Sequence, residues 1–135
     1  MSASEQLIQD YYAAFNAGDM DRFLSLLTED VIHDINQGRS EVGRQAFAAF
    51  MARMNRHYRE HLTDIVIMVS ADGRRASAEF VVHGEYLSTD EGLPEANGQR
   101  YELPAGAFFT IRDGKVARIS NYYNLQGWIA QVSAA

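Results

Sequence analysis

The sequence contains no cysteine, so structural disulfides, thiolate catalysis and zinc-thiolate sites are all excluded. It also lacks any apolar run that approaches membrane-spanning length, and its polar start has neither the basic residues nor the apolar stretch of a signal peptide. We therefore expect a cytoplasmic protein without a membrane partner. Its 135 residues have the size of one ordinary domain, which predicts a single domain over residues 1–135.

Positive charge is scarce, because the formal net charge at pH 7 is −6. This balance argues against nucleic-acid binding in general. Four arginines do gather in one segment: Arg44, Arg53, Arg56 and Arg59. Aromatic residues interleaved with a basic stripe are missing, and such arginines commonly form a solvated helix face. We expect no nucleic-acid partner.

The most informative segment runs from Ile8 to Gly38 and reads IQDYYAAFNAGDMDRFLSLLTEDVIHDINQG. Apolar residues at three- and four-residue spacing predict a first helix. They are Leu7, Ile8, Tyr11, Tyr12 and Phe15. Gly18 suits the left-handed residue past a helix end, and Asp19 can cap a short second helix. The β-branched residues of VIHDI then predict a strand, so two helices at a sharp corner lead into a sheet.

The remainder predicts one further helix and four strands, in the overall order ααβαββββ. The helix should run from about Gly43 to about His57, and a buried strand should lie within His61–Ser70. RRASAEFVVHGEYLST reads as a long alternating strand. The final strands, QRYELPAGAFFTIR and KVARISNYYNLQGW, are joined by the hairpin signal Asp113-Gly114. The terminal SAA is expected to fray.

The segment DEGLPEANG, residues 90–98, is rich in turn residues and acids. It is long for a simple hairpin connection. This length and composition suggest a lid over a pocket mouth.

The motifs YYAAFNAGD and LLTEDVIHD resemble the opening of the ketosteroid-isomerase-like branch of the nuclear transport factor 2-like superfamily, which includes SnoaL-like polyketide cyclases. The resemblance extends over nearly the whole chain. It implies an α+β fold, a cone-shaped barrel of a strongly curved mixed β-sheet around an internal pocket, with three helices in the N-terminal half. One such scaffold hosts isomerases, cyclases, hydrolases, dehydratases and non-catalytic binders, so the resemblance specifies the fold better than the reaction.

Period-two alternation assigns side chains to the inner and outer faces of the predicted sheet. Phe80, Val82, Gly84 and Tyr86 are expected to face into the cone, and Glu79, Val81, His83 and Glu85 to face solvent or a subunit partner. In the last two strands the inner sets are expected to be Ile119, Asn121 and Tyr123, and Gly106, Phe108 and Thr110. A mostly aromatic cavity suits a small apolar or aromatic ligand. The expected ligand contacts are Tyr12, Phe15, Phe80, Val82, Tyr86, Phe108 and Ile119, although large apolar side chains of this kind are also ordinary core residues.

Tyr11 is the first candidate catalytic residue, because the resemblance aligns it with the phenol that stabilises the oxyanion in ketosteroid isomerase. A phenol can donate a hydrogen bond that strengthens as negative charge develops on a carbonyl oxygen. Packing beside Tyr12 at the pocket floor is the alternative role.

His33 and Asp34 are the candidate bases, since they lie in the strand that carries the catalytic aspartate of the isomerase. Without a gap, the base position falls on Ile35. His33 then faces inward and Asp34 outward, whereas a bulge or gap would restore Asp34. A histidine suits proton transfer at neutral pH, but His33 could also serve packing, hydrogen-bonded to Tyr86, Asn121 or Tyr123.

The resemblance also implies a second oxyanion donor, which in ketosteroid isomerase is a protonated aspartate kept neutral by its apolar surroundings. The matching position reads Gly106 here. Loss of one of two such donors typically costs about 3–4 kcal/mol of transition-state stabilisation. Steroid isomerisation by the same machinery therefore requires Asn121 or Tyr123 to supply the missing bond.

The sequence gives less support to other catalytic mechanisms. No nucleophile elbow, phosphate loop or HExxH helix is present. His57 and His61 lack an evident third metal ligand, and epoxide hydrolysis lacks an inward partner carboxylate for Asp34. We predict neither a metal nor a cofactor.

Two hypotheses remain. The first is acid/base isomerase, cyclase or lyase chemistry on a hydrophobic carbonyl compound, steroid- or polyketide-like. The second is a non-catalytic binder of a small apolar metabolite, or a dimeric scaffold domain. A homodimer is expected from the resemblance and from Val81 and Leu87 on the outer face.

Overall fold

The computed structural model describes residues 2–134 and shows four helices and six strands. The helices are α1 (Ala3–Ala17), α2 (Met20–Ser25), α3 (Arg44–His57) and α4 (Leu125–Ser133). The strands are β1 (Leu27–Asp34), β2 (Ser40–Val42), β3 (Tyr58–Val69), β4 (Arg75–Tyr86), β5 (Arg100–Arg112) and β6 (Lys115–Tyr123).

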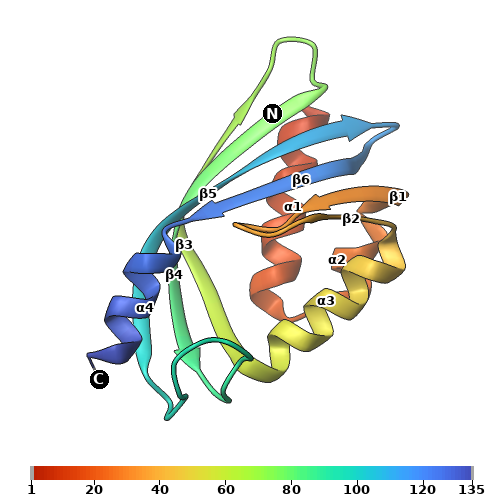
Figure 1. Ribbon diagram of the computed structural model, residues 1–135. Helices are drawn as coiled ribbons and strands as arrows, with labels where there is room; N and C mark the ends of the chain where they lie inside the picture. Colours follow the sequence, from red (N-terminus) through yellow and green to blue (C-terminus); the bar gives the residue numbers. More distant parts are fainter. Residues whose placement is uncertain (1, 135) are drawn as a thin grey trace.

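All six strands form one strongly curved sheet in the order β2-β1-β6-β5-β4-β3. The β1–β6 pair is parallel and the other pairs are antiparallel, so the sheet is mixed. Figure 1 shows α1, α2 and α3 together on one side of this sheet, while α4 lies apart beside β4 and β5. The predicted α+β architecture is confirmed, with a sheet that is curved but not closed into a barrel.

The corner between α1 and α2 forms as the sequence predicts. Gly18 follows α1 with φ 71°, a left-handed conformation that glycine adopts without a Cβ clash, and its N–H bonds back to the end of the helix. The Asp19 side chain then accepts a hydrogen bond from the Arg22 N–H and caps α2. The corner directs the chain into β1, where Leu27 and Val31 are fully buried.

Two elements were not predicted. The short strand β2 pairs with β1 across the turn that follows Asp34, and three residues are too few for alternation to be read. The sequence prediction extends the last strand through Trp128 and expects the terminal SAA to fray, so it misses helix α4. Its apolar residues Leu125, Trp128, Ile129 and Val132 have helical spacing, and Asn124 caps it. Ser133 ends α4 and Ala134 caps it, whereas Ala135 lies outside the described residues.

The prediction of which side chains of β4 face inward is confirmed. Phe80, Val82, Gly84 and Tyr86 are buried, and the residues between them are more exposed. The prediction for β5 is wrong by one residue. Phe108 is 57% exposed and faces outward with Gly106 and Thr110, while Phe109 is 2% exposed. The segment AGAFF is apolar or small at every position, so alternation could not select the buried face. A slip of one residue moves every side chain of the strand to the opposite face.

Candidate functional site

Two acidic side chains lie on the inner face of the sheet: Glu41 of β2 opposite His33, and Glu60 among aromatic and apolar residues. Glu60 of β3 lies opposite Gly84 of β4, which lies opposite Tyr101 of β5, so the three residues form one row across three strands. Leu62, Val82 and Leu103 form the next row and are buried. Glu60 itself is exposed to solvent, although protein surrounds it on this face.

The absence of a side chain at Gly84 creates the contact between the two outer residues of this row. A Cβ atom there would lie 2.2 Å from Cζ of Tyr101, so the tyrosine ring occupies the space above the glycine backbone. The Tyr101 hydroxyl thereby crosses β4 and donates a hydrogen bond to Oε2 of Glu60 over 2.5 Å. Glycine in mid-strand is costly unless something packs over it, and here the ring does.

Aromatic rings build the wall beside Glu60. Tyr58 and Tyr86 stack with centroids 5.4 Å apart, and Trp128 of α4 meets Tyr58, Tyr86 and Tyr101 edge-on at 5.9, 4.9 and 5.8 Å. Such edge-on and stacked pairs stabilise a fixed arrangement of rings. We call Tyr58, Tyr86, Tyr101 and Trp128 the aromatic wall.

The electrostatic setting of Glu60 favours its neutral form. Loss of solvation raises the pKa of the carboxyl, and the hydrogen bond from Tyr101 opposes that rise. Desolvation also raises the pKa of Tyr101 and of Tyr123, and the negative charge of Glu60 adds to both shifts. The phenols near Glu60 therefore stay protonated and can donate hydrogen bonds.

The structure separates the two candidate bases of β1. His33 is 2% exposed on the inner side, where its ring stacks on Phe47 at 4.3 Å and meets Phe50 edge-on at 4.6 Å. Its Nδ1 atom has no hydrogen-bond partner among the described residues. Burial lowers the pKa of His33, and the negative charges of Glu41 and Asp34 partly offset this, so the imidazole is neutral at pH 7.

Asp34 points to the opposite side, as the ungapped register predicted. Nε and Nη2 of Arg118 donate to it at 2.8 and 3.1 Å, and the hydroxyls of Ser40 and Ser120 also donate. Burial works against its ionisation, but these hydrogen bonds and the charge of Arg118 prevail and lower the pKa of Asp34 to about 2. The alternative in which Asp34 faces the pocket is wrong, because its carboxylate is held on the outer face.

Tyr11 and Tyr12 lie deep in the interior. Each is 4% exposed, and Tyr11 packs against Tyr12, Phe23 and Phe109 at centroid distances of 5.1, 4.6 and 5.4 Å. Burial raises the pKa of both phenols, and the Tyr12 hydroxyl has no partner among the described residues. The rings pack as core, and the proposed oxyanion role of Tyr11 stays a prediction.

The remaining predicted site residues are either buried in the core or more exposed on the inner face of β6. Phe80 is buried against Tyr12 at 5.3 Å, Ile119 is 1% exposed, and Phe15 is partly buried. Asn121 and Tyr123 continue the inner face of β6 past Ile119 and are more exposed. Val82 and Tyr86 are buried on the inner face of β4. Phe108 cannot line an inner cavity, and Gly106 cannot mark the position of an inward donor, because both face outward.

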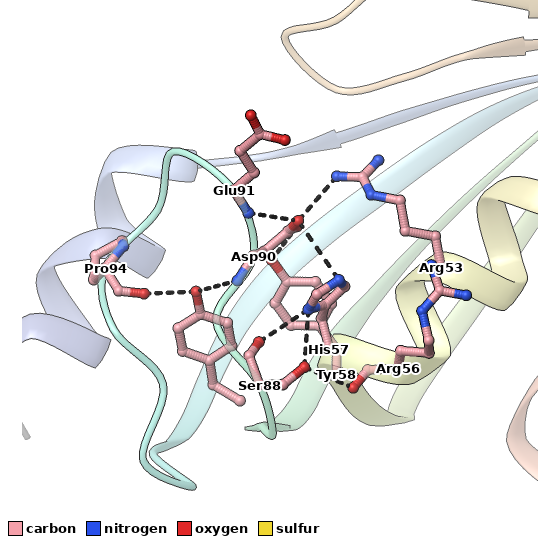
Figure 2. Close-up of polar contacts among 9 residues, drawn as sticks. Arg53, Arg56, His57, Tyr58, Ser88, Asp90, Glu91 and Pro94 are labelled. Carbon is pink, nitrogen blue, oxygen red and sulfur yellow. Dashed lines mark hydrogen bonds and ion pairs between the residues drawn. The ribbon is translucent and has the colours of Figure 1, made fainter.

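The loop expected to act as a lid is fastened to α3, β3 and β4, and Figure 2 shows its contacts with Arg53 of α3 and Tyr58 of β3. Asp90, 4% exposed, accepts hydrogen bonds from Arg53 at 3.0 Å and from the Tyr58 hydroxyl at 2.8 Å. The Tyr86 hydroxyl accepts from the Asp90 N–H at 3.0 Å and donates to the Pro94 carbonyl at 2.6 Å. Two tyrosines of the aromatic wall therefore also anchor this loop.

A second set of contacts in Figure 2 ties the loop to the end of α3. His57 Nδ1 lies 3.0 Å from Oγ of Ser88 and 3.1 Å from its carbonyl oxygen, and the Ser88 hydroxyl donates to the Arg56 carbonyl. His57 therefore helps to hold the loop against the end of α3. Among residues 2–134 no three potential metal-ligating side chains gather at one point.

Sequence reasoning missed Glu60, Tyr101, Tyr58 and Trp128. The strand with Glu60 was expected to begin at His61, but β3 begins at Tyr58, directly after α3. Tyr58, Glu60 and Leu62 have the spacing of one strand face, and this alternation was the available signal. The contact with Tyr101 could not be read from sequence, since it depends on the register of three strands.

Two surface depressions lie away from the aromatic wall. One of about 810 Å³ lies between the start of α1 and the hairpins at Asp72-Gly73 and Asp113-Gly114, and it contains none of the predicted site residues. Another of about 500 Å³ is lined by Asn36, Tyr122, Tyr123 and the Pro104–Gly106 segment. The second adjoins the rim of the inner face at Tyr123.

Comparison with known proteins identifies the family. A family model described as a SnoaL-like domain matches residues 8–119. The chain belongs to the SnoaL-like domain family. This SnoaL-like protein matches no curated protein sequence. No helix among residues 2–134 has the length and apolar character needed to cross a membrane.

Solved structures agree with the family. The SnoaL-like chain is 67% identical to a candidate polyketide cyclase from Pseudomonas putida KT2440, with a TM-score of 0.94 and 98% of each chain covered. It is 60% identical to another from Xanthomonas campestris pv. campestris, also at a TM-score of 0.94, with 96% of each chain covered. TerC, crystallised with polyporic acid, shares the fold at 18% identity and a TM-score of 0.76, with 98% of this chain and 99% of TerC covered.

Proposed function

We propose that this protein binds a hydrophobic carbonyl compound, steroid- or polyketide-like, on the inner face of its sheet and performs isomerase, cyclase or lyase chemistry on it by acid–base catalysis. The observation that carries the proposal is the aromatic wall, which faces the same side as the predicted polar residues Asn121 and Tyr123. Flat rings offer contact area to a planar or apolar ligand, and a few polar groups can fix its orientation.

The polar groups of the inner face supply the elements of such chemistry. Tyr123 stays protonated because desolvation and the charge of Glu60 raise its pKa, so it can donate a hydrogen bond to a developing enolate oxygen. Asn121 lies two residues earlier on the same face. His33 remains a predicted proton-transfer group on this side, whereas Asp34 has no place in the scheme because it faces outward.

The relatives support small-molecule chemistry. The two most similar structures named above are described as candidate polyketide cyclases, and TerC was crystallised with polyporic acid. A cytoplasmic location stays a prediction. The identity of the ligand is the part of the proposal that experiment must supply.

The test is a thermal-unfolding screen followed by turnover assays. A ligand that binds only the folded state must raise the unfolding midpoint as its concentration increases. We expect a dose-dependent rise with aromatic polyketides or steroids and turnover of at least one of them. A rise without turnover favours the alternative, a non-catalytic binder. No rise with any carbonyl compound would overturn the proposal.

We also infer a homodimer formed through the outer face of the sheet. Phe108 and Tyr122 are each 57% exposed and lie edge-on at 5.7 Å. On β3, Met68 is 50% exposed in the same row as Phe108, and Val66 is 49% exposed in the same row as Tyr122, with Ser77 and Glu79 of β4 between them. Exposed apolar side chains grouped in this way mark an interaction surface. The partner we expect is a second copy of this chain.

A further inference from the structure

Glu60 has the three properties that a general base of the inner face needs. The residue is exposed to solvent, it lies beside the aromatic wall, and a hydrogen bond holds its carboxylate in place. Oε2 accepts that bond from Tyr101, while Oε1 accepts none from any described residue. One carboxylate oxygen is thus fixed and the other is left for a ligand.

The alternatives on β1 lack at least one of these properties. His33 is wedged between Phe47 and Phe50 at 2% exposure, so a ligand must displace packed rings to reach it. Asp34 is saturated by Arg118, Ser40 and Ser120 on the outer face. Access and orientation therefore favour Glu60.

We propose that Glu60 is the proton acceptor of the inner face and that Tyr101 is the positioning residue that holds its carboxylate; this inference rests on the proposed function. Oε1 takes a proton from the carbon next to a ketone carbonyl. The C–H bond breaks, an O–H bond forms on Glu60, and the electron pair moves to the carbonyl oxygen to give an enolate. Return of the proton to the same or a conjugated carbon restores the carboxylate, so no co-reactant is consumed.

The surroundings of Glu60 suit this step. The protein that surrounds its carboxyl on the inner face reduces the solvation of the charge and raises its pKa, which makes the carboxylate a stronger base. The groups that face it are Tyr101 from β5, Tyr123 from β6 and Tyr58 from β3, and the pKa of each is raised. The Tyr58 hydroxyl is committed to Asp90, and Tyr123 is the predicted donor to the enolate oxygen.

The decisive measurement is exchange of ketone α-hydrogens for deuterium in D₂O, followed by proton NMR with 2-tetralone, 2-indanone and cyclohexenone. Glu60→Gln keeps the size of the side chain and an acceptor for Tyr101 but removes the base. We expect a loss of about 100-fold or more in the catalysed exchange rate, in the range that general bases contribute. Glu85→Gln, the same change on the outer face of β4, should leave the rate unchanged.

Tyr101→Phe tests the positioning role. Its hydrogen bond lowers the pKa of Glu60, so its removal should raise that pKa and move the rising limb of the exchange-rate profile to higher pH. A packing role for the hydroxyl would change the unfolding midpoint without moving this limb.

The outcomes separate the two proposals. Exchange by the wild type that persists in Glu60→Gln overturns the role of Glu60 and leaves the proposed function standing. Ketones that bind, shown by a raised unfolding midpoint, without any catalysed exchange overturn the acid–base function and the role of Glu60 with it. Exchange that disappears in Glu60→Gln, while this variant unfolds at or above the wild-type midpoint, supports both.

Discussion

The side chain of Asn16, at the end of α1, forms two hydrogen bonds with the backbone of Leu62 in β3. Its Nδ2 donates to the Leu62 carbonyl and its Oδ1 accepts from the Leu62 N–H, each at 2.9 Å. The contact lies next to a register shift in the β3–β4 pair, where Asp64 has φ 54°. One amide thus joins the first helix to the sheet at its irregular point.

Asn16→Ala should lower the free energy of unfolding by about 2 kcal/mol, because two partly buried backbone groups lose their partner at roughly 1 kcal/mol each. Urea denaturation measures the difference. Gln6→Ala is the matched control, since it removes an amide from α1 that forms only an exposed hydrogen bond, to the Asp10 carboxylate. Equal losses in the two variants would contradict a special role for Asn16.

The ion pair of Asp34 should make stability depend on acid pH. The carboxyl titrates at about 2 in the folded protein against its ordinary value of 3.8, so its contribution is present above about pH 4 and is lost as pH falls toward 2. Because solvent screens the partly exposed ion pair, we expect a contribution of roughly 1 kcal/mol. Urea midpoints of wild type and Asp34→Asn should converge between pH 4 and 2, whereas Asp113→Asn should track the wild type throughout.

Glu60 should act on stability in the opposite sense. Its folded-state pKa is raised, so protonated Glu60 favours the folded protein at low pH, and this contribution is lost as pH rises through the raised pKa. Glu60→Gln should therefore unfold at a higher temperature than the wild type at pH 8, with the difference shrinking toward pH 4. Thermal melts across this range measure it, with Glu85→Gln as control. A lower midpoint for Glu60→Gln at pH 8 would contradict the electrostatic assignment.

Asp90→Ala should release the loop between β4 and β5. Its carboxylate holds Arg53 and Tyr58, so its loss leaves the Tyr58 hydroxyl without a partner, at a cost of about 1–3 kcal/mol. We expect faster cleavage by a protease within residues 87–99, followed by mass spectrometry. Glu91→Ala changes a neighbouring acid that contributes only its backbone N–H, and its cleavage rate should match the wild type.

Phe108→Lys should yield a monomer. The substitution places a charge in the exposed apolar group of the outer face, where a second copy is expected to pack. Light scattering with size-exclusion chromatography measures the mass. Val42→Lys is the control, because Val42 is 67% exposed on the separate strand β2. A monomeric wild type would refute the dimer itself.

The sequence predicted those parts of the fold in which one local rule acts alone. The α1–α2 corner follows from Gly18 and Asp19, and the inner face of β4 from strict alternation. Prediction failed where the local pattern fits two strand faces equally well, or where a contact joins residues far apart in the sequence. Phe108 and Phe109 are adjacent and equally apolar, so only pairing with β4 decides which is buried. The contact of Glu60 with Tyr101 joins residues 41 positions apart, and no local pattern encodes it.

Trp128 gives the protein an optical reporter. It is the single tryptophan of the sequence, and its indole touches Tyr58, Tyr86 and Tyr101. Its emission therefore arises entirely from the aromatic wall, with three tyrosines close enough to transfer excitation to it. A ligand that stacks on this wall should quench or shift that emission in the unlabelled wild-type protein, so binding at the inner face can be followed in real time without a dye or an assay substrate.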